Sequence, residues 1–345
     1  RLNLLLQNNG RRHRFGLTAE PPEALASRLD LRGDFRGSDP GHLADWQGDA
    51  YVALDYADLA IWRQWVDYPV KLSRGSGAVR LWASVARQQA IAMTADIALH
   101  DVELQLGKSQ PAITLQSLTG RVEGRVRKNG YAASARHLSL RLQDGLHVDP
   151  TDFDFDWNDA TPQTLATGSF SANQLDFDTL ARLAERLPFD VATRRQLADY
   201  APRGLLQDLK VSWSLKPPGN PGVDELPVLE KYGIQASFSR LSLNAQGALP
   251  GFTGLTGSVR GDEKGGSFRL DSQEAALALP EIFADPRIEL GELDGRSKCH
   301  RRSPAGSTFR KPGRRWRRER KLHLPAQRPD RWRHRPLGPP DARPG

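Results

Sequence analysis

The chain has 345 residues and a formal net charge of +8, but this charge is very unevenly distributed. Residues 1–295 hold 32 Lys+Arg and 38 Asp+Glu, giving −6, whereas residues 296–345 hold 17 and 3, giving +14. A single cysteine, Cys299, excludes a disulfide framework and a thiolate metal site, and no apolar run of 18 residues is present to form a transmembrane helix within this sequence. Because the sequence begins with Arg1, we expect it to be part of a longer protein.

Alternation of apolar and polar residues dominates residues 1–295 and predicts β-strands. In residues 91–99 the odd positions are apolar, and after Asp101 the apolar residues change to even positions, as they do at a β-bulge. Further strands are expected in residues 118–126, 138–142, 153–157, 209–215, 234–243, 255–260 and 267–270. One apolar and one polar face per strand favours a mainly β fold, a long curled antiparallel sheet with a few short helices.

One sequence unit occurs twice, as LTGRVEG in residues 118–124 and as LTGSVRG in residues 255–261. Each copy leads into a glycine-containing turn and then into another alternating strand. The Asn129-Gly130 pair suits the positive φ angles of a type I′ hairpin. Repeated hairpins predict a continuous concave face, which fits an elongated ligand better than a small substrate.

Short helices are predicted at three places. The first covers residues 58–66, before Pro69, and the second covers residues 180–187, with Asp178 as its N-cap and Pro188 as its stop. Asp190 caps the third, which ends near Pro202. We expect the helical insertion at about residues 176–204 to pack on the sheet or to plug its end.

From Arg296 the composition changes abruptly, and residues 296–345 contain no Ile, Val or Tyr but many Arg, Pro and Gly. This segment cannot bury a core, so we predict a disordered tail. One interpretation is a nucleic-acid-binding arm, because Trp316 lies among arginines and could stack on bases. The other is an out-of-frame translation, which we favour because the change falls inside a strand-like unit at residues 290–295. Nucleic acid is therefore not the expected partner.

The sequence offers little chemistry for catalysis. Asp152, Asp154 and Asp156 are spaced like the start of a calcium loop, but Trp157 stands where that loop needs glycine. Strand alternation explains these aspartates as a solvated face. The Gly-Ser-Gly run at residues 75–77 lacks the GxGxxG continuation, and no histidine lies at a metal-ligand spacing from another. We therefore expect no catalytic residue, no metal site and no cofactor, and predict that the protein is not an enzyme.

A series of short motifs occurs in one order across residues 1–298. They are His13, Ala19-Glu20-Pro21-Pro22, Leu29-Asp30-Leu31-Arg32, Trp46-Gln47-Gly48, Tyr51, Trp62, Pro69, Gly75-Ser76-Gly77, Arg80, Trp82, Leu118-Thr119-Gly120-Arg121, Leu180 to Pro188, Arg195, Leu197-Ala198, Pro202, Gly204, Trp213, Pro250-Gly251-Phe252, Leu255-Thr256-Gly257, Gly265-Gly266, Pro280 and Phe283. In their order and spacing these motifs resemble the YhdP branch of the AsmA-like family, large envelope proteins of Gram-negative bacteria. After Lys298 the family pattern continues with a tryptophan and more strands, whereas this sequence has Cys299 and the arginine-rich run. That departure agrees with an out-of-frame tail.

The resemblance implies a repeating β-groove with an apolar interior, periplasmic and tethered to the inner membrane by a helix that this sequence does not contain. It implies that phospholipid acyl chains move along the groove toward the outer membrane, and that other parts of the longer protein contact both membranes. The residues expected to line the groove are Leu118, Val122, Val126, Leu138, Leu140 and Leu142.

Three alternatives stay open. The apolar strand faces could close on each other as the core of a sandwich, or the repeats could form an envelope scaffold that binds no lipid. An enzyme acting on envelope glycans is a more distant possibility.

Overall fold

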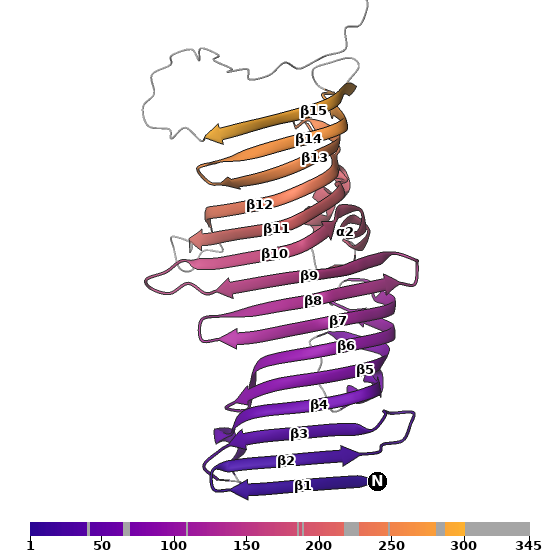
Figure 1. Cartoon of the computed structure of the whole chain (residues 1–345), viewed down its shortest axis with the longest axis vertical. Coiled ribbons are helices and arrows are strands. Elements are labelled where there is room, and N and C mark those ends of the chain that lie inside the picture. The colour runs from indigo at the N-terminus through magenta and orange to yellow at the C-terminus, as the bar shows by residue number, and fades with distance from the viewer. Residues whose placement is uncertain are drawn as a thin grey trace, which may run out of the picture. The chain divides into compact units, whose positions relative to one another are not determined.

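The computed structural model describes residues 1–39, 42–64, 70–107, 110–184, 186–187, 190–216, 228–247, 249–280 and 287–300. These residues form one antiparallel sheet of 15 strands that pair strictly in chain order, β1 to β15 (Figure 1). Residues 296–300 of the predicted disordered tail belong to the last strand instead, and the tail from residue 301 onward lies outside the described residues. The strands are β1 Leu2–Asn9, β2 Arg12–Ala19, β3 Leu29–Arg36, β4 Gln47–Asp58, β5 Lys71–Ala86, β6 Gln89–Gln105, β7 Ile113–Arg127, β8 Gly130–Leu142, β9 His147–Asn158, β10 Ala166–Asp176, β11 Arg203–Lys216, β12 Val228–Leu243, β13 Gly251–Asp262, β14 Gly265–Ala278 and β15 Arg287–His300.

The predicted fold class is confirmed, since the described residues are mainly strands of one curled antiparallel sheet. The sheet is not closed, because β1 and β15 are its two edges. The alternative of a two-sheet sandwich is wrong, because all the described strands belong to this one sheet.

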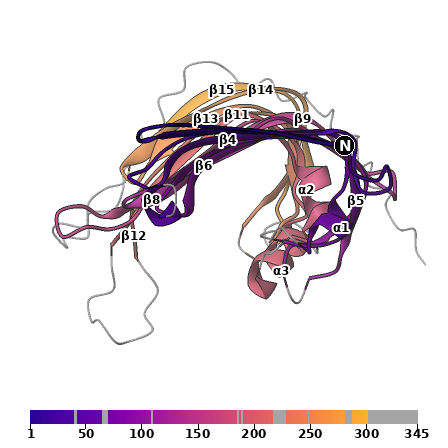
Figure 2. The same ribbon diagram turned by 90° about the horizontal axis from the view of Figure 1, so that it is seen from below.

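The curl of the sheet is built by β-bulges in several of its strands. Asp101, His137, Asp208 and Arg240 have φ angles of 50°, 50°, 51° and 50°, and the pairing register shifts beside each of them. Each shift adds one residue to one strand, which bends that strand and increases its twist. The change of apolar phase at Asp101 is therefore a bulge, as predicted. Viewed along its length, the sheet forms an open arch (Figure 2).

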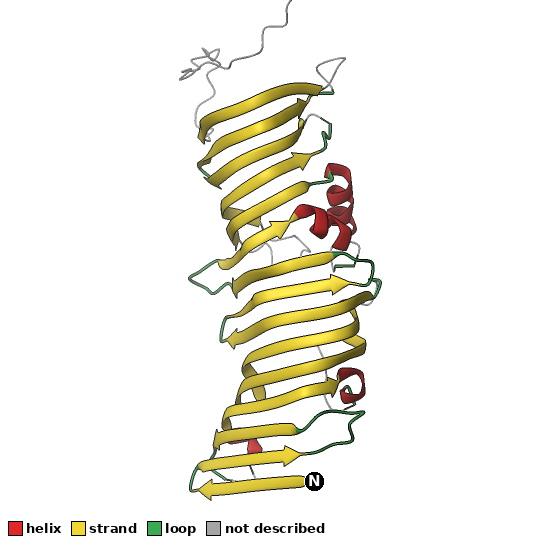
Figure 3. Cartoon of the chain, turned by 45° about the vertical axis from the view of Figure 1, so that its right-hand side comes forward, coloured by secondary structure: helices red, strands yellow, loops and turns green. Residues whose placement is uncertain are grey.

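Three short α-helices lie in the connections at one long edge of the arch (Figure 3). They are α1 Leu59–Trp62, between β4 and β5, and α2 Phe177–Leu183 and α3 Val191–Tyr200, between β10 and β11. In a meander, successive connections alternate between the two edges of the sheet. We call the edge with these helices the helix rim, and the opposite edge, with the turns after β1, β5, β7 and β13, the hairpin rim.

Two details of the helix predictions are wrong. The N-cap of α2 is Asp176, whose carboxylate accepts from the backbone N–H of Thr179 at 3.0 Å, whereas Asp178 accepts from the N–H of Gly204. The first predicted helix is shorter than expected, since α1 ends at Trp62, and residues 65 and 66 of the predicted span lie outside the described residues. The predicted cap of α3 is confirmed, because Asp190 accepts from the N–H of Thr193 at 2.7 Å.

The predicted hairpin turn is also shifted. Arg127 pairs with Gly130, so Lys128 and Asn129 are the two loop residues, and of these four residues only Gly130 has a positive φ, 144°. A Cβ at Gly130 would lie 2.0 Å from the carbonyl oxygen of Trp157, so the close approach of β9 requires glycine there. The repeated unit turns in the same way, with Asp262 paired to Gly265.

Candidate functional site

One face of the sheet carries an unbroken apolar row that crosses the strands. Directly paired residues of antiparallel strands point to the same face, so the printed register places one member from each of β1 to β14 side by side. The members of this central row are Leu6, Phe15, Gly33, Ala50, Ala83, Met93, Gly124, Ala133, Phe155, Phe170, Val211, Ile234, Gly261 and Gly266. None of them is polar, and we call this face of the sheet the apolar face.

A second apolar row runs beside the first, two residues nearer the helix rim. Across β1 to β10 it consists of Leu4, Leu17, Leu31, Val52, Leu81, Ala95, Val122, Ala135, Phe153 and Ala172. In β11 to β14 the row continues through Leu209, Ala236, Val259 and Phe268, of which Leu209 and Ala236 form a buried cluster with Ala172. The apolar strip is therefore at least two rows wide over most of the sheet.

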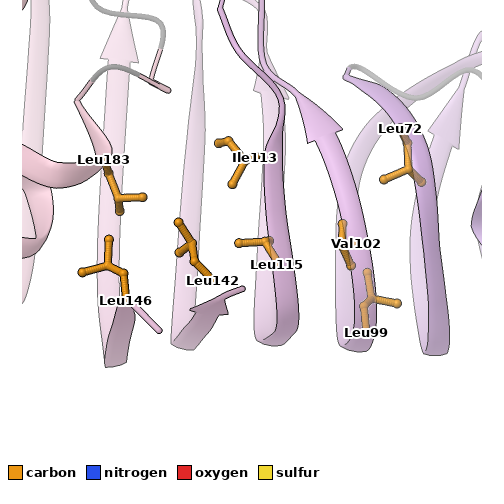
Figure 4. Packing of buried hydrophobic residues seen from close by; sticks show 8 residues of the cluster. All are labelled: Leu72, Leu99, Val102, Ile113, Leu115, Leu142, Leu146 and Leu183. Carbon is orange, nitrogen blue, oxygen red and sulfur yellow. The ribbon is translucent and has the colours of Figure 1, made fainter. Parts of the chain in front are cut away.

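Nearest the helix rim, the apolar face is closed. Leu72, Leu99, Val102, Ile113, Leu115, Leu142 and Leu146 form a buried cluster with Leu183 of α2 (Figure 4). Leu59 of α1 packs against the same cluster. Because these helices lie under the arch in Figure 2, the apolar face is the concave one.

Toward the hairpin rim, the same face is open. Val126 is 61% exposed, and Met93, Tyr131, Tyr232 and Ile234 are also exposed. A Cβ built at Gly124, in the central row, would meet no atom within 4 Å. Contiguous exposed apolar side chains of this kind are typical of binding surfaces. The apolar face is thus a trough with one packed side and one open side.

The opposite face is polar and is held by ion pairs between strands. Arg12 donates to Asp34 at 2.5 Å, Arg121 donates to Asp96, and Arg136 pairs with Asp154. The hydrogen bond from Arg12 is the main cause that lowers the pKa of Asp34 to about 2, and the bond from Arg121 likewise lowers the pKa of Asp96. These charged side chains lie on the convex side of the sheet, away from the two apolar rows.

A shallow depression of about 1210 Å³ lies on this polar face, over β1 to β7. Its lining includes Arg14, Arg32, Tyr51 and Trp82 of the polar face, together with residues of the apolar rows such as Phe15. The acidic and basic groups in it pair with each other, as Arg14 does with Asp34 and Arg32 with Asp30. It therefore lacks an excess of either charge, and the apolar face remains the stronger candidate.

The residues predicted to line a groove all come from the two strands in the middle of this trough. Leu118 pairs with Leu140, Val122 with Ala135 and Val126 with Tyr131, which places them on the apolar face. Leu142 is buried, at 2% exposure, in the cluster under α2, whereas Leu118, Val122, Leu138 and Leu140 are half-buried. The set thus runs from the closed side to the open side.

Sequence reasoning missed the aromatic residues of the open side. The indole of Trp213 covers Gly168, because a Cβ at Gly168 would lie 2.2 Å from Cε2 of the indole. On the other side, Trp213 pairs with Tyr232 of the next strand. Phe155 contacts both Tyr131 and Trp213, with ring centroids 5.7 and 6.2 Å apart. Alternation placed Phe155 on an apolar face, but only the strand register brings these rings together.

The groups considered for chemistry have structural partners. Asp156 accepts from Arg127 at 2.6 Å, and Asp152 accepts from the backbone N–H of His137, so the aspartates of β9 belong to the polar face. Among the described residues, no group of three or more His, Cys, Asp or Glu side chains could hold a metal ion. No helix in the described part of the chain has the length and apolar character needed to cross a membrane.

Comparison with known proteins gives one match. The sequence model of a protein family described as YhdP protein matches residues 1–308. No curated protein and no solved structure matches the chain.

Proposed function

The chain belongs to the YhdP protein family, and on that premise we propose that it conducts phospholipids between the membranes of the bacterial envelope along its apolar face. At the level of the family, membership implies AsmA-like envelope lipid transport. The finer assignment, a periplasmic path for phospholipids toward the outer membrane, is our proposal. The observation that carries it is the central row, which stays apolar through consecutive strands while one side of the face stays open.

The free-energy barrier to lipid movement through water arises from exposure of the acyl chains, so an apolar trough can lower it without any chemical reaction. Exposing an acyl chain to water costs about 0.8 kcal/mol per CH₂, so a two-chain lipid crossing the periplasm unaided meets a barrier of roughly 20 kcal/mol. A continuous apolar surface removes most of that barrier. Because each strand contributes an apolar residue to the central row, a lipid that moves from one strand to the next exchanges one apolar contact for a similar one.

Neighbouring residues of one strand give a matched test, because they point to opposite faces. A photo-reactive benzoylphenylalanine at Met93 or Ile234 lies on the apolar face, and the same group at Thr94 or Gln235 lies on the polar face. We expect irradiation of the protein in a lipid-rich host to produce phospholipid adducts at Met93 and Ile234, and few at Thr94 and Gln235. Mass spectrometry of the intact protein measures the adducts.

The competing function is an envelope scaffold without lipid. A protein that purifies free of phospholipid, with no adduct at any of the four positions, supports the scaffold and contradicts lipid conduction. Equal adducts on both faces would reflect adventitious contact with membranes and would also contradict the proposal.

A further inference from the structure

The open side of the trough ends in a row of aromatic side chains with polar atoms. On β7 to β12, the row next to the hairpin rim consists of Val126, Tyr131, Trp157, Gly168, Trp213 and Tyr232. Its aromatic members are tyrosines and tryptophans, whereas the central row beside it carries phenylalanines, Phe155 and Phe170. Tyr and Trp favour boundaries where one end of the ring is apolar and the other is wet.

The other side of the trough has the opposite character. Toward the helix rim the same face passes through Leu118 and Leu140 to a cluster of aliphatic side chains covered by α2. Leu115 and Leu142 of that cluster are each 2% exposed and Val102 is 1% exposed, so water does not reach these side chains. Along each strand, the face therefore changes from an aromatic border at the hairpin rim to a buried aliphatic cluster near the helix rim.

Resting on the proposed function, we propose that bound phospholipids lie along the strands, with head groups at the Tyr–Trp row of the hairpin rim and acyl chain ends toward the helix rim. On β7, Val126 and Leu118 are eight residues apart, which corresponds to about 26 Å. One leaflet of a bilayer has a hydrocarbon depth of about 15 Å. The apolar width of the trough thus accommodates the acyl chains of one leaflet with the head group outside.

Side chains with hydrogen-bond donors lie at the hairpin rim, where this orientation places the lipid head group. The hydroxyl groups of Tyr131 and Tyr232 are on exposed side chains, and Nε1 of Trp157 donates to Asp159 at 2.9 Å at the same rim. The two tyrosine hydroxyl groups can donate to the phosphate and ester oxygens of a lipid, whereas the single N–H of Trp157 is already used by Asp159.

Two phospholipid probes test the orientation, one with a diazirine on the head group and one with a diazirine at the end of an acyl chain. Each is incorporated into vesicles of phosphatidylethanolamine and phosphatidylglycerol, incubated with the full chain and irradiated. Trypsin cleavage after Lys128, Arg136 and Arg141 separates a peptide with Tyr131 from a peptide with Leu138 and Leu140. We expect the head-group probe to label the first peptide and the chain-end probe to label the second.

Replacing both tyrosines tests the donors themselves. In the double variant Tyr131→Phe, Tyr232→Phe, head-group labelling should fall about fivefold, since each hydroxyl contributes one hydrogen bond, while chain-end labelling persists. Ser134→Ala, on the polar face of the same strand, is the control and should leave both labels unchanged.

Reversed labels, or both probes on the same peptide, would overturn this orientation and leave the proposed function standing. Absence of labelling by either probe would overturn the proposed function together with this inference.

Discussion

The imidazole of His13 stacks on the indole of Trp46, with ring centroids 4.5 Å apart and planes 5° from parallel. His13 is almost fully buried, and its Nδ1 lies 3.0 Å from Oδ1 of Asn8, while its buried Nε2 has no hydrogen-bond partner among the described residues. His13 pairs with Phe35, so the stack lies on the apolar face at the hairpin rim. The indole therefore covers the end of the trough over β1 to β4.

Removing this cover should destabilise the first strands. We expect Trp46→Ala to lower the free energy of unfolding by about 1–2 kcal/mol, through lost ring contact and apolar area. Trp46→Phe should retain most of the stability. Gly37→Ala provides an independent check, because its Cβ would lie 2.3 Å from Cδ1 of Trp46 and would displace the ring. Urea unfolding followed by tryptophan fluorescence measures the effect, and an unchanged Trp46→Ala variant would show that the stack is not stabilising.

The packed and open sides of the trough should respond differently to truncation. Leu142→Ala removes a side chain that is 2% exposed and should cost about 3 kcal/mol of unfolding free energy, including the cavity left behind. Val126→Ala alters a side chain that is 61% exposed and should cost less than about 0.5 kcal/mol. Chemical denaturation of the lipid-free protein measures both. Similar losses would mean that the hairpin side is packed rather than open.

Alanine substitutions at two glycines should have opposite effects, because a Cβ would clash with the backbone at Gly130 and would meet no atom at Gly124. Gly130→Ala should lower the unfolding free energy by about 2 kcal/mol or more, because φ is 144° and the new Cβ would meet the carbonyl oxygen of Trp157. Gly124→Ala should leave stability unchanged or raise it by up to about 1 kcal/mol, because nothing lies within 4 Å of its Cβ position. A marked loss in Gly124→Ala would contradict an open trough over β7.

The strand pairing of the polar face predicts acid sensitivity. The pKa of Asp34 lies at about 2 in the folded chain, below its ordinary value of 3.8. A lowered folded pKa means that the ionised group stabilises the fold above pH 3.8, and that this contribution disappears as pH falls toward 2. Asp34→Asn should therefore be less stable than wild type near neutral pH and should converge with it near pH 2. Thermal unfolding between pH 2 and 7 measures this, and parallel curves would contradict it.

The edge of the sheet at β1 should cause self-association. β1 pairs only with β2 among the described strands, and all eight of its residues are exposed, including Leu4 and Leu5. Unpaired edges of this kind template pairing with another chain. We expect concentration-dependent aggregation that Leu5→Lys reduces, measured by light scattering. Thr94→Lys, in the same register row but inside the sheet, should not reduce it.

The sequence by itself determined the strands, the curl and the two-sided character of the sheet. Alternation in residues 91–99 and its change of phase at Asp101 locate a strand and its bulge, because side-chain direction in a strand has a period of two. The Asp190 cap was equally readable, since a cap is a local hydrogen bond between neighbouring residues. The cap of α2 was misassigned because Asp176 and Asp178 both precede the helical pattern, and only the contact of Asp178 with Gly204 tells them apart.

The tertiary structure decided which apolar residues remain open. Leu142 and Val126 belong to equally alternating strands, yet α2 covers the first and leaves the second exposed. Strand register likewise created the row of tyrosines and tryptophans at the hairpin rim. Trp157 and Trp213 lie in this row because both pair with Gly168, from opposite sides. The reason is that alternation fixes only which face a side chain points to. What that face meets, whether a helix, a neighbouring ring or an unoccupied trough, depends on register and on contacts between residues distant in the sequence.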